Sequence, residues 1–551
     1  MSSADRRSLI ILLAALAGAC LLGTAVHPGT ARSGRGEAGA PALRLDAEGQ
    51  VLGARADVHF TADGRSPGAG SPVLRDGRLP EGSAEALLVI PTSPQWRHPL
   101  GSFPEGRVVR AVRLDSRGRP GAETVCAAVP NEHPGLPVLA LVVDPGAFFD
   151  ADSGIYVPGD AIWDQRAEFV RRYPDDQRWW KYPGNYHYRG EQAERHGQLF
   201  WFAPGGQGRF RADPAWSADV HLRINGNNTR GFPQHALRVI FPEPLSVPLF
   251  GEARGQGFHR VLLRTSGNDQ DRTFFRDALQ HRLCAGEPFG TSACVQTVLY
   301  VNGAYWGLHN LRERLDRKEL ARRLGVKPKR ITILADRLEL YEGDSAERKA
   351  FARFLTRSER WEPGGDAFID SLERYMDVDE FMRYMSAQII FGNTDWPEQN
   401  GKWYRYTGRP DSVPGPRDGR WHFLMGDSDL SFGLTVGPAF DMFAHVDRHA
   451  SAPLSRLLKA CLRSPALQDR FRRIVLAQLD GPLSADRMVA EATAMRDVID
   501  AEMHRHTRRW RRPVDHAAWS VHVDALLTFA RERGPHVREQ LVKHFPSTDR
   551  R

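Results

Sequence analysis

Two short segments between residues 393 and 433 place acidic side chains at the ends of structured runs, and they constrain the fold more than any other part of the chain. The first reads NTDWPEQNGKWYRY and holds Asp395 and Asn400, and the second reads WHFLMGDSDLSFG and holds Asp427 and Asp429. A loop rich in Gly, Pro and Asp joins them, so the chain is expected to turn back between them. Mg²⁺ prefers oxygen ligands and is usually held by one or two carboxylates with substrate phosphates. We therefore expect the fold to gather these side chains around one divalent ion.

The order of these residues is similar to that of protein kinases, although the rest of the kinase signature is absent. A kinase catalytic loop carries an Asp that accepts the substrate hydroxyl proton and an Asn that holds metal, and a second metal-binding Asp follows next to a Gly. Asp395, Asn400 and the pair Asp427/Asp429 follow that order, with Gly433 just beyond. An ordinary Asp-Trp-Pro turn and a solvated strand cap are the alternative interpretations.

The composition excludes several other classes of site. The 551 residues carry 75 basic and 67 acidic side chains, a formal charge of +8, without a dense basic block of the kind that binds nucleic acid. The twenty His residues form no zinc-protease pattern, and the sequence has neither a Walker loop nor a Gly-x-Ser-x-Gly elbow. The five Cys residues lack the paired spacing of a structural zinc site.

The first residues indicate export. Residues 1–26 combine Arg6 and Arg7 with a long apolar run, as expected for a signal peptide or an N-terminal membrane anchor, and Cys20 lies in a context similar to a lipoprotein cleavage site. Residues 27–40 are small and polar and predict a flexible linker. The chain is therefore expected to be extracellular or anchored at the cell surface. A disulfide between Cys284 and Cys294 is one possibility in that compartment.

The remaining chain divides by its pattern. Residues 41–130 contain short alternating runs and turns typical of an all-β module, and EALLVIP (85–91) is counted among the strands. Later segments predict a buried strand at 136–143, paired strands in 216–241, a strand followed by a helix in 260–283, and a hairpin that turns at Asn302-Gly303. Residues 450–545 show helical periodicity, with Arg508–Arg512 interpreted as a solvated helix end.

Five blocks in this order carry a resemblance to a known family. They read GNNTRGFPQHALRVIF, RTSGNDQDRTFFRDAL, YVNGAYWGLHNLRERLD, NTDWPEQNGKWYRY and MGDSDLSFG. Together they resemble the spore-coat protein H (CotH) kinase-like family. VHFTADGRSP with VVRAVRLDSRGRPG resembles the β-sandwich module at the C-terminus of chitobiase-type hexosaminidases.

The resemblance implies an α+β architecture. It would consist of a β-sandwich module over 41–130, an atypical kinase-like domain over 136–435 and a helical extension over 436–545. It also implies transfer of phosphate from ATP, with Mg²⁺ or Mn²⁺, to Ser or Thr of a partner protein.

The family's site residues carry over by position. Asp395 would be the catalytic Asp, and Asn400, Asp427 and Asp429 would hold the metal. Basic side chains would contact the nucleotide, namely those of Arg230, Arg238, Arg276 and Lys402. Glu313 would hold a basic phosphate-binding residue in place. For Arg276 the alternative is a structural salt bridge with Asp269 or Asp277.

One departure from the family pattern leaves other functions open. His235 stands where family members usually have Lys, and a neutral imidazole would neutralise phosphate poorly. An inert surface scaffold or adhesion protein with a kinase-like domain is therefore one alternative. A carbohydrate-active hydrolase is another, although a glycosidase needs two carboxyl groups across a sugar cleft, and the Asp-x-Asp with Asn fits a metal better.

Overall fold

The computed structural model describes residues 40–546 except 56, 82–83, 134 and 176. The predicted signal or anchor over 1–26 and most of the linker therefore lie outside the described residues. The strands, in chain order, are β1 Arg44–Leu45, β2 Val51–Leu52, β3 Val58–Thr61, β4 Arg107–Arg113, β5 Thr124–Pro130, β6 Val138–Val143, β7 Arg195–Phe202, β8 Phe210–Arg211, β9 Trp216–Asn225, β10 Ala236–Leu245, β11 Phe258–Arg264, β12 Cys294–Val301, β13 Ala304–Glu313, β14 Ile331–Ala335, β15 Glu339–Glu342, β16 Gly401–Tyr406 and β17 Trp421–Met425.

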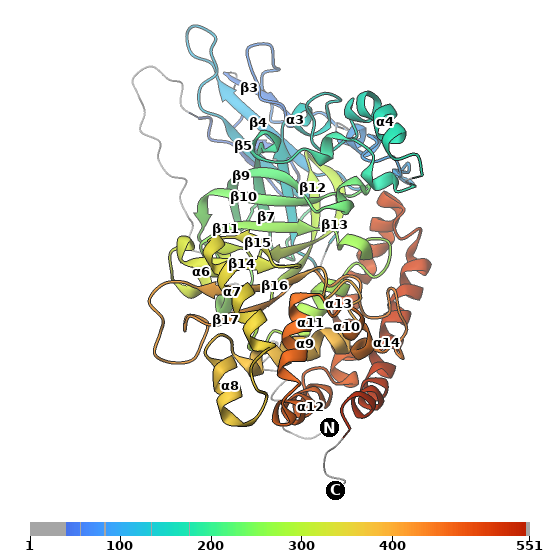
Figure 1. Cartoon of the computed structure of the whole chain (residues 1–551). Coiled ribbons are helices and arrows are strands. Elements are labelled where there is room, and N and C mark those ends of the chain that lie inside the picture. Colours follow the sequence, from blue (N-terminus) through green and yellow to red (C-terminus); the bar gives the residue numbers. More distant parts are fainter. Residues whose placement is uncertain (1–39, 56, 82–83, 134, 176, 547–551) are drawn as a thin grey trace, which may run out of the picture.

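Helices follow and interrupt these strands, so the mixed α and β content expected from the sequence is confirmed. The α-helices are α2 Glu85–Leu88, α3 Pro145–Phe149, α4 Ala161–Arg172, α5 Arg276–Leu283, α6 Arg317–Leu324, α7 Ser345–Ser358, α8 Gly365–Glu373, α9 Val378–Phe391, α10 Met442–Arg448, α11 Pro453–Cys461, α12 Pro465–Asp480, α13 Ala485–Trp510 and α14 His516–His544. Four of them, α11 to α14, form the predicted helical tail at the lower right of Figure 1.

A closed barrel forms the middle of the molecule. Its strands follow the order β10-β11-β13-β12-β6-β7-β9, and all neighbours are antiparallel except β6 and β12. The predicted strand at 136–143 is β6, which is buried along its whole length. Asn302 (φ 47°) and Gly303 (φ 83°) make the tight turn between β12 and β13, as predicted, because two consecutive residues with positive φ match the twist of a two-residue hairpin.

A second sheet and helices α7 to α12 lie in the lower half of the molecule (Figure 1). Its strand order is β15-β14-β16-β17, and β17 also reaches the turn after α5, where the Gly290 N–H donates to the Phe423 carbonyl at 2.8 Å. Helix α9 packs on β17 and α12. The chain thus passes from α9 through residues 393–400 into β16 and β17, and then directly into Asp427.

The N-terminal part shares its core with the barrel. Its sheet has the order β3-β4-β5-β8, so it takes a strand from residues 210–211, beyond the predicted boundary at 130. The side chains of Leu88, Phe103, Val108 and Val129 belong to the same continuous apolar cluster as the barrel and the tail helices. The prediction of a strand at 85–91 is wrong, because Glu85–Leu88 form helix α2 and bury Leu88 on this core.

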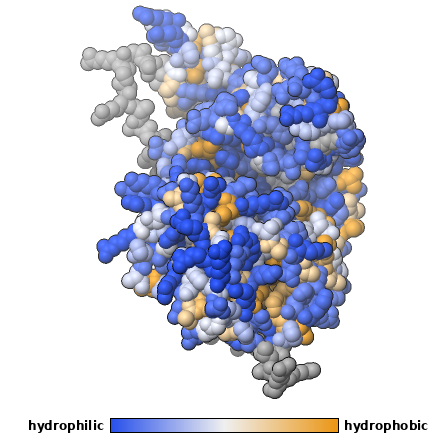
Figure 2. Space-filling model, viewed as in Figure 1, coloured by the Kyte–Doolittle hydropathy of each residue, from blue (hydrophilic) through white to orange (hydrophobic). Residues whose placement is uncertain are grey.

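Hydrophilic residues cover most of the face of the molecule seen in Figure 2.

The four described cysteines, Cys284 and Cys294 included, are free thiols, so the disulfide considered between these two is not formed. Within the described residues no helix is both long and apolar enough to cross a bilayer.

The Arg508–Arg512 segment is not a solvated helix end, contrary to the prediction. Arg509 has no exposed surface, and its guanidinium lies 4.1 Å from the ring centre of Trp510 and 4.8 Å from that of Trp306. Arg508 donates to the Leu100 carbonyl at 3.0 Å. The helical pattern predicted α13 correctly, but it could not show that the N-terminal part and the barrel would cover the end of the helix.

Candidate active site

The segments NTDWPEQNGKWYRY (393–406) and WHFLMGDSDLSFG (421–433) meet at one cleft. Gly401 pairs with Met425 across β16 and β17, which places Asn400 beside Gly426. The approach is close, since a Cβ on Gly426 would lie 2.1 Å from the Asn400 carbonyl oxygen. Asp395, Asn400, Asp427 and Asp429 all line the cleft at this point, which we call the carboxylate end.

Asp395 and Asn400 are fixed to each other in the loop after α9. The Asn400 amide donates to Asp395 at 3.3 Å, and Asn400 adopts a positive φ of 64°. The neighbouring Trp396 is fully buried and anchors the loop. Burial, and then the nearby charge of Asp427, raise the pKa of Asp395. The negative charge of Asp427 therefore disfavours ionisation of Asp395.

Asp427 and Asp429 differ in their surroundings. The Asp427 side chain keeps 35% of its surface exposed, whereas that of Asp429 keeps 3%. The Asp429 carboxylate accepts the Asn268 N–H at 2.7 Å, next to Gly267, where a Cβ would lie 2.2 Å from the same carboxylate oxygen. Burial and the charge of Asp427 raise the pKa of Asp429 well above its usual value, despite Arg264 nearby. Asp427 is therefore the more accessible ligand, and Asp429 is held by the backbone.

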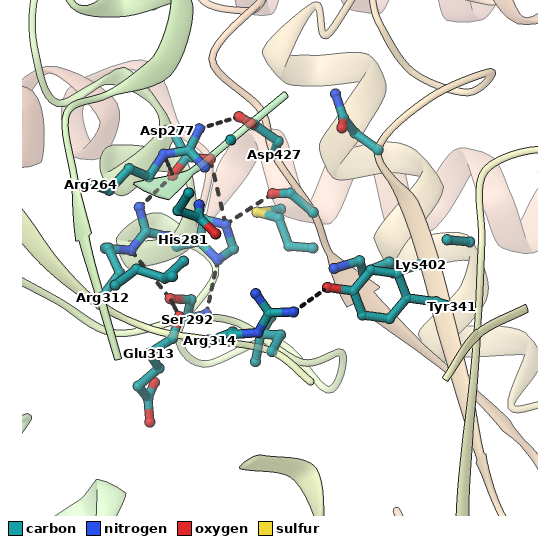
Figure 3. A pocket seen from close by; sticks show the side chains of 18 of the residues that line it. Arg264, Asp277, His281, Ser292, Arg312, Glu313, Arg314, Tyr341, Lys402 and Asp427 are labelled. Carbon is teal, nitrogen blue, oxygen red and sulfur yellow. Dashed lines mark hydrogen bonds and ion pairs between the residues drawn. The ribbon is translucent and has the colours of Figure 1, made fainter. Parts of the chain in front are cut away.

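Arg264 on β11 links both aspartates to the barrel. Its guanidinium makes an ion pair with Asp427 and lies 3.8 Å from Asp429. Asp277 on α5 pairs with Arg312 and lies 3.7 Å from Arg264, and it also accepts the Ser428 N–H at 3.0 Å. Burial opposes ionisation of Asp277, but Arg264 and Arg312 outweigh it and lower its pKa. Asp277 thus holds two arginines and the 427–429 turn in one arrangement (Figure 3).

The other part of the cleft is a basic cavity of about 410 Å³, which we call the cation end. It shares Asn225, Gly226, Arg264, Asp336, Asn400 and Asp427 with the carboxylate end, so the two form one continuous cleft. Its basic side chains come from both halves of the molecule and are Arg189, Arg238, Arg264, Arg312, Arg314 and Lys402.

Several of these cations make no ion pair with a carboxylate among the described residues. Arg238 on β10 donates weakly to Asn225 at 3.4 Å, and its Nε is buried without a hydrogen-bond partner. Burial, and then the charge of Arg314, lower the pKa of Arg238 to about 10. Lys402 lies with its Nζ 4.0 Å from the ring centre of Tyr341, which also accepts a hydrogen bond from Arg314 at 2.9 Å (Figure 3). Buried donors without partners favour an anionic ligand.

An apolar patch lies beside these cations. Leu262, Leu315, Ala335 and Met425 line the cavity together with Tyr341. They come from β11, from the connection after β13, and from β14 and β17 of the lower sheet. The cavity therefore offers a flat apolar ligand group a place between the halves, next to donors for phosphate oxygens.

Two predicted nucleotide contacts are structural instead. Arg276 is buried in α5, where its Nε donates to Asp269 at 3.0 Å and its Nη1 donates to the carbonyls of Ser431 and Phe432. This is the salt bridge with Asp269 that was the alternative. Arg230 is also buried and donates to the carbonyls of Gly226, Tyr186, Tyr188 and Ile224. Neither residue lines the cleft, because backbone carbonyls take up their donors.

Glu313 lines the cavity but does not hold one of its cations. Its carboxylate pairs with Arg323 at 2.7 Å and accepts the Ala293 N–H at 2.6 Å. In Figure 3 it points away from Lys402. Burial raises the pKa of Glu313, although Arg323 opposes this. The residues that the sequence argument missed are its neighbours in the same run, Arg312 and Arg314, together with Arg264 at the end of an apolar strand.

His235 lies away from the cleft. It is fully buried, its Nε2 contacts the Thr92 carbonyl at 3.0 Å, and its backbone N–H donates to Tyr156 at 3.1 Å. Burial lowers its pKa to about 3, so the ring is neutral. The presence of His235 in place of Lys therefore does not change the positive charge available in the cleft to a phosphate.

The oxygen donors at the carboxylate end fit a hard divalent cation. Asn400 uses its amide nitrogen on Asp395, which leaves its carbonyl oxygen for a cation, and Asp427 is close to both. No group of three or more His, Cys, Asp or Glu among the described residues has the arrangement of a complete metal site. Mg²⁺ does not require one, because it keeps waters and takes substrate phosphates as ligands.

The fold is mixed α and β, and its cleft joins carboxylates to a basic cavity. The model of the family described as CotH kinase protein matches residues 222–537, which is more than half of the chain. The protein therefore belongs to the CotH kinase family and is kinase-like in character. No curated protein matches the chain.

Proposed function

We propose that the protein transfers phosphate from Mg-ATP or Mn-ATP to Ser or Thr hydroxyls of a partner protein. The observation that carries the proposal is the continuous cleft in which Asp395, Asn400 and Asp427 adjoin the unpaired cations Arg238 and Lys402. Phosphoryl transfer is catalysed mainly by positioning and by electrostatic stabilisation of charge, and this cleft supplies both.

Each residue has a defined task in this mechanism. Asp395 accepts the proton of the acceptor hydroxyl as the hydroxyl oxygen bonds to the γ-phosphorus, while the bond from this phosphorus to the β–γ bridging oxygen breaks and ADP leaves. Asn400 orients Asp395. Asn400 and Asp427, with Asp429 behind them, would hold the metal ion, which supplies charge neutralisation at the phosphates when bound. Arg238, Arg314 and Lys402 are placed to bind phosphate oxygens, and the base is placed against Leu315 and Met425.

The test is transfer of labelled phosphate from ATP to a mixture of Ser- and Thr-containing polypeptides by the full chain. Asp395→Asn and Asp427→Asn are expected to lower transfer at least about 10²-fold while the chain stays folded. Asp411→Asn is the matched control, because Asp411 makes only a surface ion pair with Arg417 at 2.8 Å and lies outside the cleft. Equal loss in all three variants, or no transfer by the unmodified chain, would contradict the proposal.

A specific observation favours a second function, that of an inert nucleotide-binding scaffold. Arg264 already neutralises Asp427, so this cation stands where a metal ion would otherwise bind. Under this alternative, nucleotide binds with the same affinity with and without Mg²⁺, and no phosphate is transferred. Under the proposed function, removal of Mg²⁺ by a chelator weakens nucleotide binding. Calorimetric titration of ATP with and without metal separates the two.

A further inference from the structure

A second pocket adjoins the cleft on its outer side. It has a volume of about 470 Å³ and lies between α4, the segment that follows it and the tip of the β9–β10 loop. Three rings and three cations contribute most of its lining: Phe169, Tyr173, Trp180, Arg178, Lys181 and Arg189. The sequence analysis assigned no role to this region, and the proposed transfer mechanism does not use it.

The charge of this pocket is one-sided. None of the described residues that line it is a carboxylate, and neither Lys181 nor Arg189 makes an ion pair with another described residue. His187, which also lines it, adds no charge at neutral pH, because burial and then the charge of Arg230 lower its pKa to about 4. The pocket therefore presents positive charge beside aromatic surface.

The pocket shares its inner wall with the cleft. Arg189 also lines the cation end, and Asn227 and Asn228 also line the carboxylate end that contains Asp395. Arg189 donates to the Asn227 side chain at 3.2 Å. A ligand that occupies the pocket thus contacts the same loop that borders the reacting groups.

This wall is rigid. A Cβ on Gly231 would lie 2.5 Å from the Trp180 carbonyl oxygen, so the two backbones are in direct contact. Trp179 packs on Phe232 with 5.4 Å between ring centres, and the guanidinium of Arg512 covers both rings. The pocket is therefore preformed by contacts between the segment after α4 and the loop after β9, and it does not need to be built when a ligand arrives.

We propose that this pocket is the acceptor-recognition site and that it binds acidic side chains of the polypeptide that is phosphorylated in the cleft. The inference rests on the proposed phosphotransfer. An extended acceptor passes over the tip of the β9–β10 loop, with its hydroxyl beside Asp395 and its Asp or Glu residues beside Lys181 and Arg189. The rings of Tyr173 and Trp180 pack on the aliphatic parts of the peptide.

Binding can be measured without catalysis. Three fluorescent peptides are used that differ in charge, with Glu, Lys or Gln around a central Ala in place of the phosphorylated residue. We expect the full chain to bind the Glu peptide at least about tenfold more tightly than the Lys peptide at low salt, and this preference to fall as salt rises. Equal affinity for the Glu, Lys and Gln peptides would overturn the proposal.

Charge reversal identifies the pocket. Lys181→Glu is expected to weaken binding of the Glu peptide roughly three- to tenfold and to strengthen that of the Lys peptide. Arg171→Glu is the matched control, since Arg171 on α4 is 80% exposed and outside the pocket, and the change in net charge is the same. Lys181→Gln provides a milder variant if the reversal disturbs folding. The same loss in the control variant would overturn the proposal.

Transfer assays separate this inference from the function on which it rests. With Ser restored to the peptides, the Glu peptide is expected to have the higher kcat/KM, and Lys181→Glu to raise its KM more than it lowers kcat. Phosphate transfer with equal kcat/KM for the Glu and Lys peptides would overturn the acceptor site and leave the kinase function intact. Binding that depends on Lys181 without any transfer would support the pocket and overturn the kinase function.

Discussion

At the scale of single residues, burial and pairing separate the arginines that support the fold from those available to a ligand. Arg276 has its Nε on Asp269 and its Nη1 on two carbonyls, whereas Arg238 has a buried Nε with no partner. Both were predicted as nucleotide contacts, since a sequence shows charge but not where the donors point. The contrast gives a direct test by substitution.

Arg276→Met is expected to destabilise the protein by about 3–5 kcal/mol, because it leaves Asp269 buried without its cation. Arg238→Met removes a buried charge that has no carboxylate partner, so the free energy of unfolding should stay within about 1 kcal/mol of the unmodified value. Its ATP affinity should fall at least about tenfold. Denaturant unfolding and nucleotide titration check both variants. Equal loss of stability would contradict the assignment of Arg238 to the ligand.

Gly426 tests whether the approach of the two site segments matters. Gly426→Ala places a methyl group 2.1 Å from the Asn400 carbonyl oxygen and must push Asn400 away from Asp427. Phosphate transfer should fall on the order of 10²-fold, because a displacement of about 1 Å is enough to disturb such a site. Gly437→Ala is the control, since nothing lies within 4 Å of its Cβ position. An active Gly426→Ala variant would show that this contact does not position the metal ligands.

At the scale of elements, the order α9, loop, β16, β17 and turn brings the acidic residues together. The sequence predicted β6, the β12–β13 hairpin, α5 and the tail helices, because each has a strong local pattern. It predicted the meeting of residues 395–400 with 427–429 only through motif order. At the cation end the resemblance predicted Arg238 and Lys402 but not Arg264 and Arg312. These two lie on β11 and β13, which pair with each other although α5 and β12 lie between them in the sequence.

The packing of α9 on β17 includes a buried charged group that makes stability depend on pH. His422 on β17 contacts Glu380 on α9 at 2.6 Å and Asp418 at 3.2 Å. Burial opposes its charge, but these carboxylates outweigh burial and raise the pKa of His422 to about 9. A raised folded-state pKa means that the stabilisation is complete below the unfolded pKa of about 6.5 and is lost as pH rises through about 9.

We therefore expect the free energy of unfolding to fall by about 3 kcal/mol between pH 6.5 and pH 9.5, as this group loses its proton. Denaturant unfolding at each pH measures the fall. His422→Gln should be less stable at pH 6.5 and should show a flatter pH dependence over this range. A variant with the same slope as the unmodified chain would assign the pH dependence to other groups.

At the scale of the whole molecule, the N-terminal part holds the loop beside the cleft in place. Thr92 and Ser93 follow α2, and their hydroxyl groups donate to the carbonyls of Pro233 and Gly231, each at 2.6 Å. These two hydrogen bonds join the segment after α2 to the β9–β10 loop. Figure 1 shows this part above the barrel, with the tail helices along one side. The module predicted over 41–130 therefore contacts the part matched to the family directly.

This arrangement predicts that residues 136–551, which include the part matched to the family, do not fold alone. A chain that begins at residue 136 loses Leu88, Phe103 and Val129 from the common core and leaves the carbonyls of Gly231 and Pro233 without their donors. Each lost apolar side chain costs about 1.5–3 kcal/mol, so the three together cost about 5–9 kcal/mol, which is comparable to the usual stability of a domain. The shortened chain should aggregate or unfold without a cooperative transition in calorimetry, while the full chain shows one.

In the full chain, Ser93→Ala alone should lower the free energy of unfolding by about 1–3 kcal/mol, because the Gly231 carbonyl is buried. A monodisperse shortened chain that unfolds cooperatively at the melting temperature of the full chain would show that the two parts are independent.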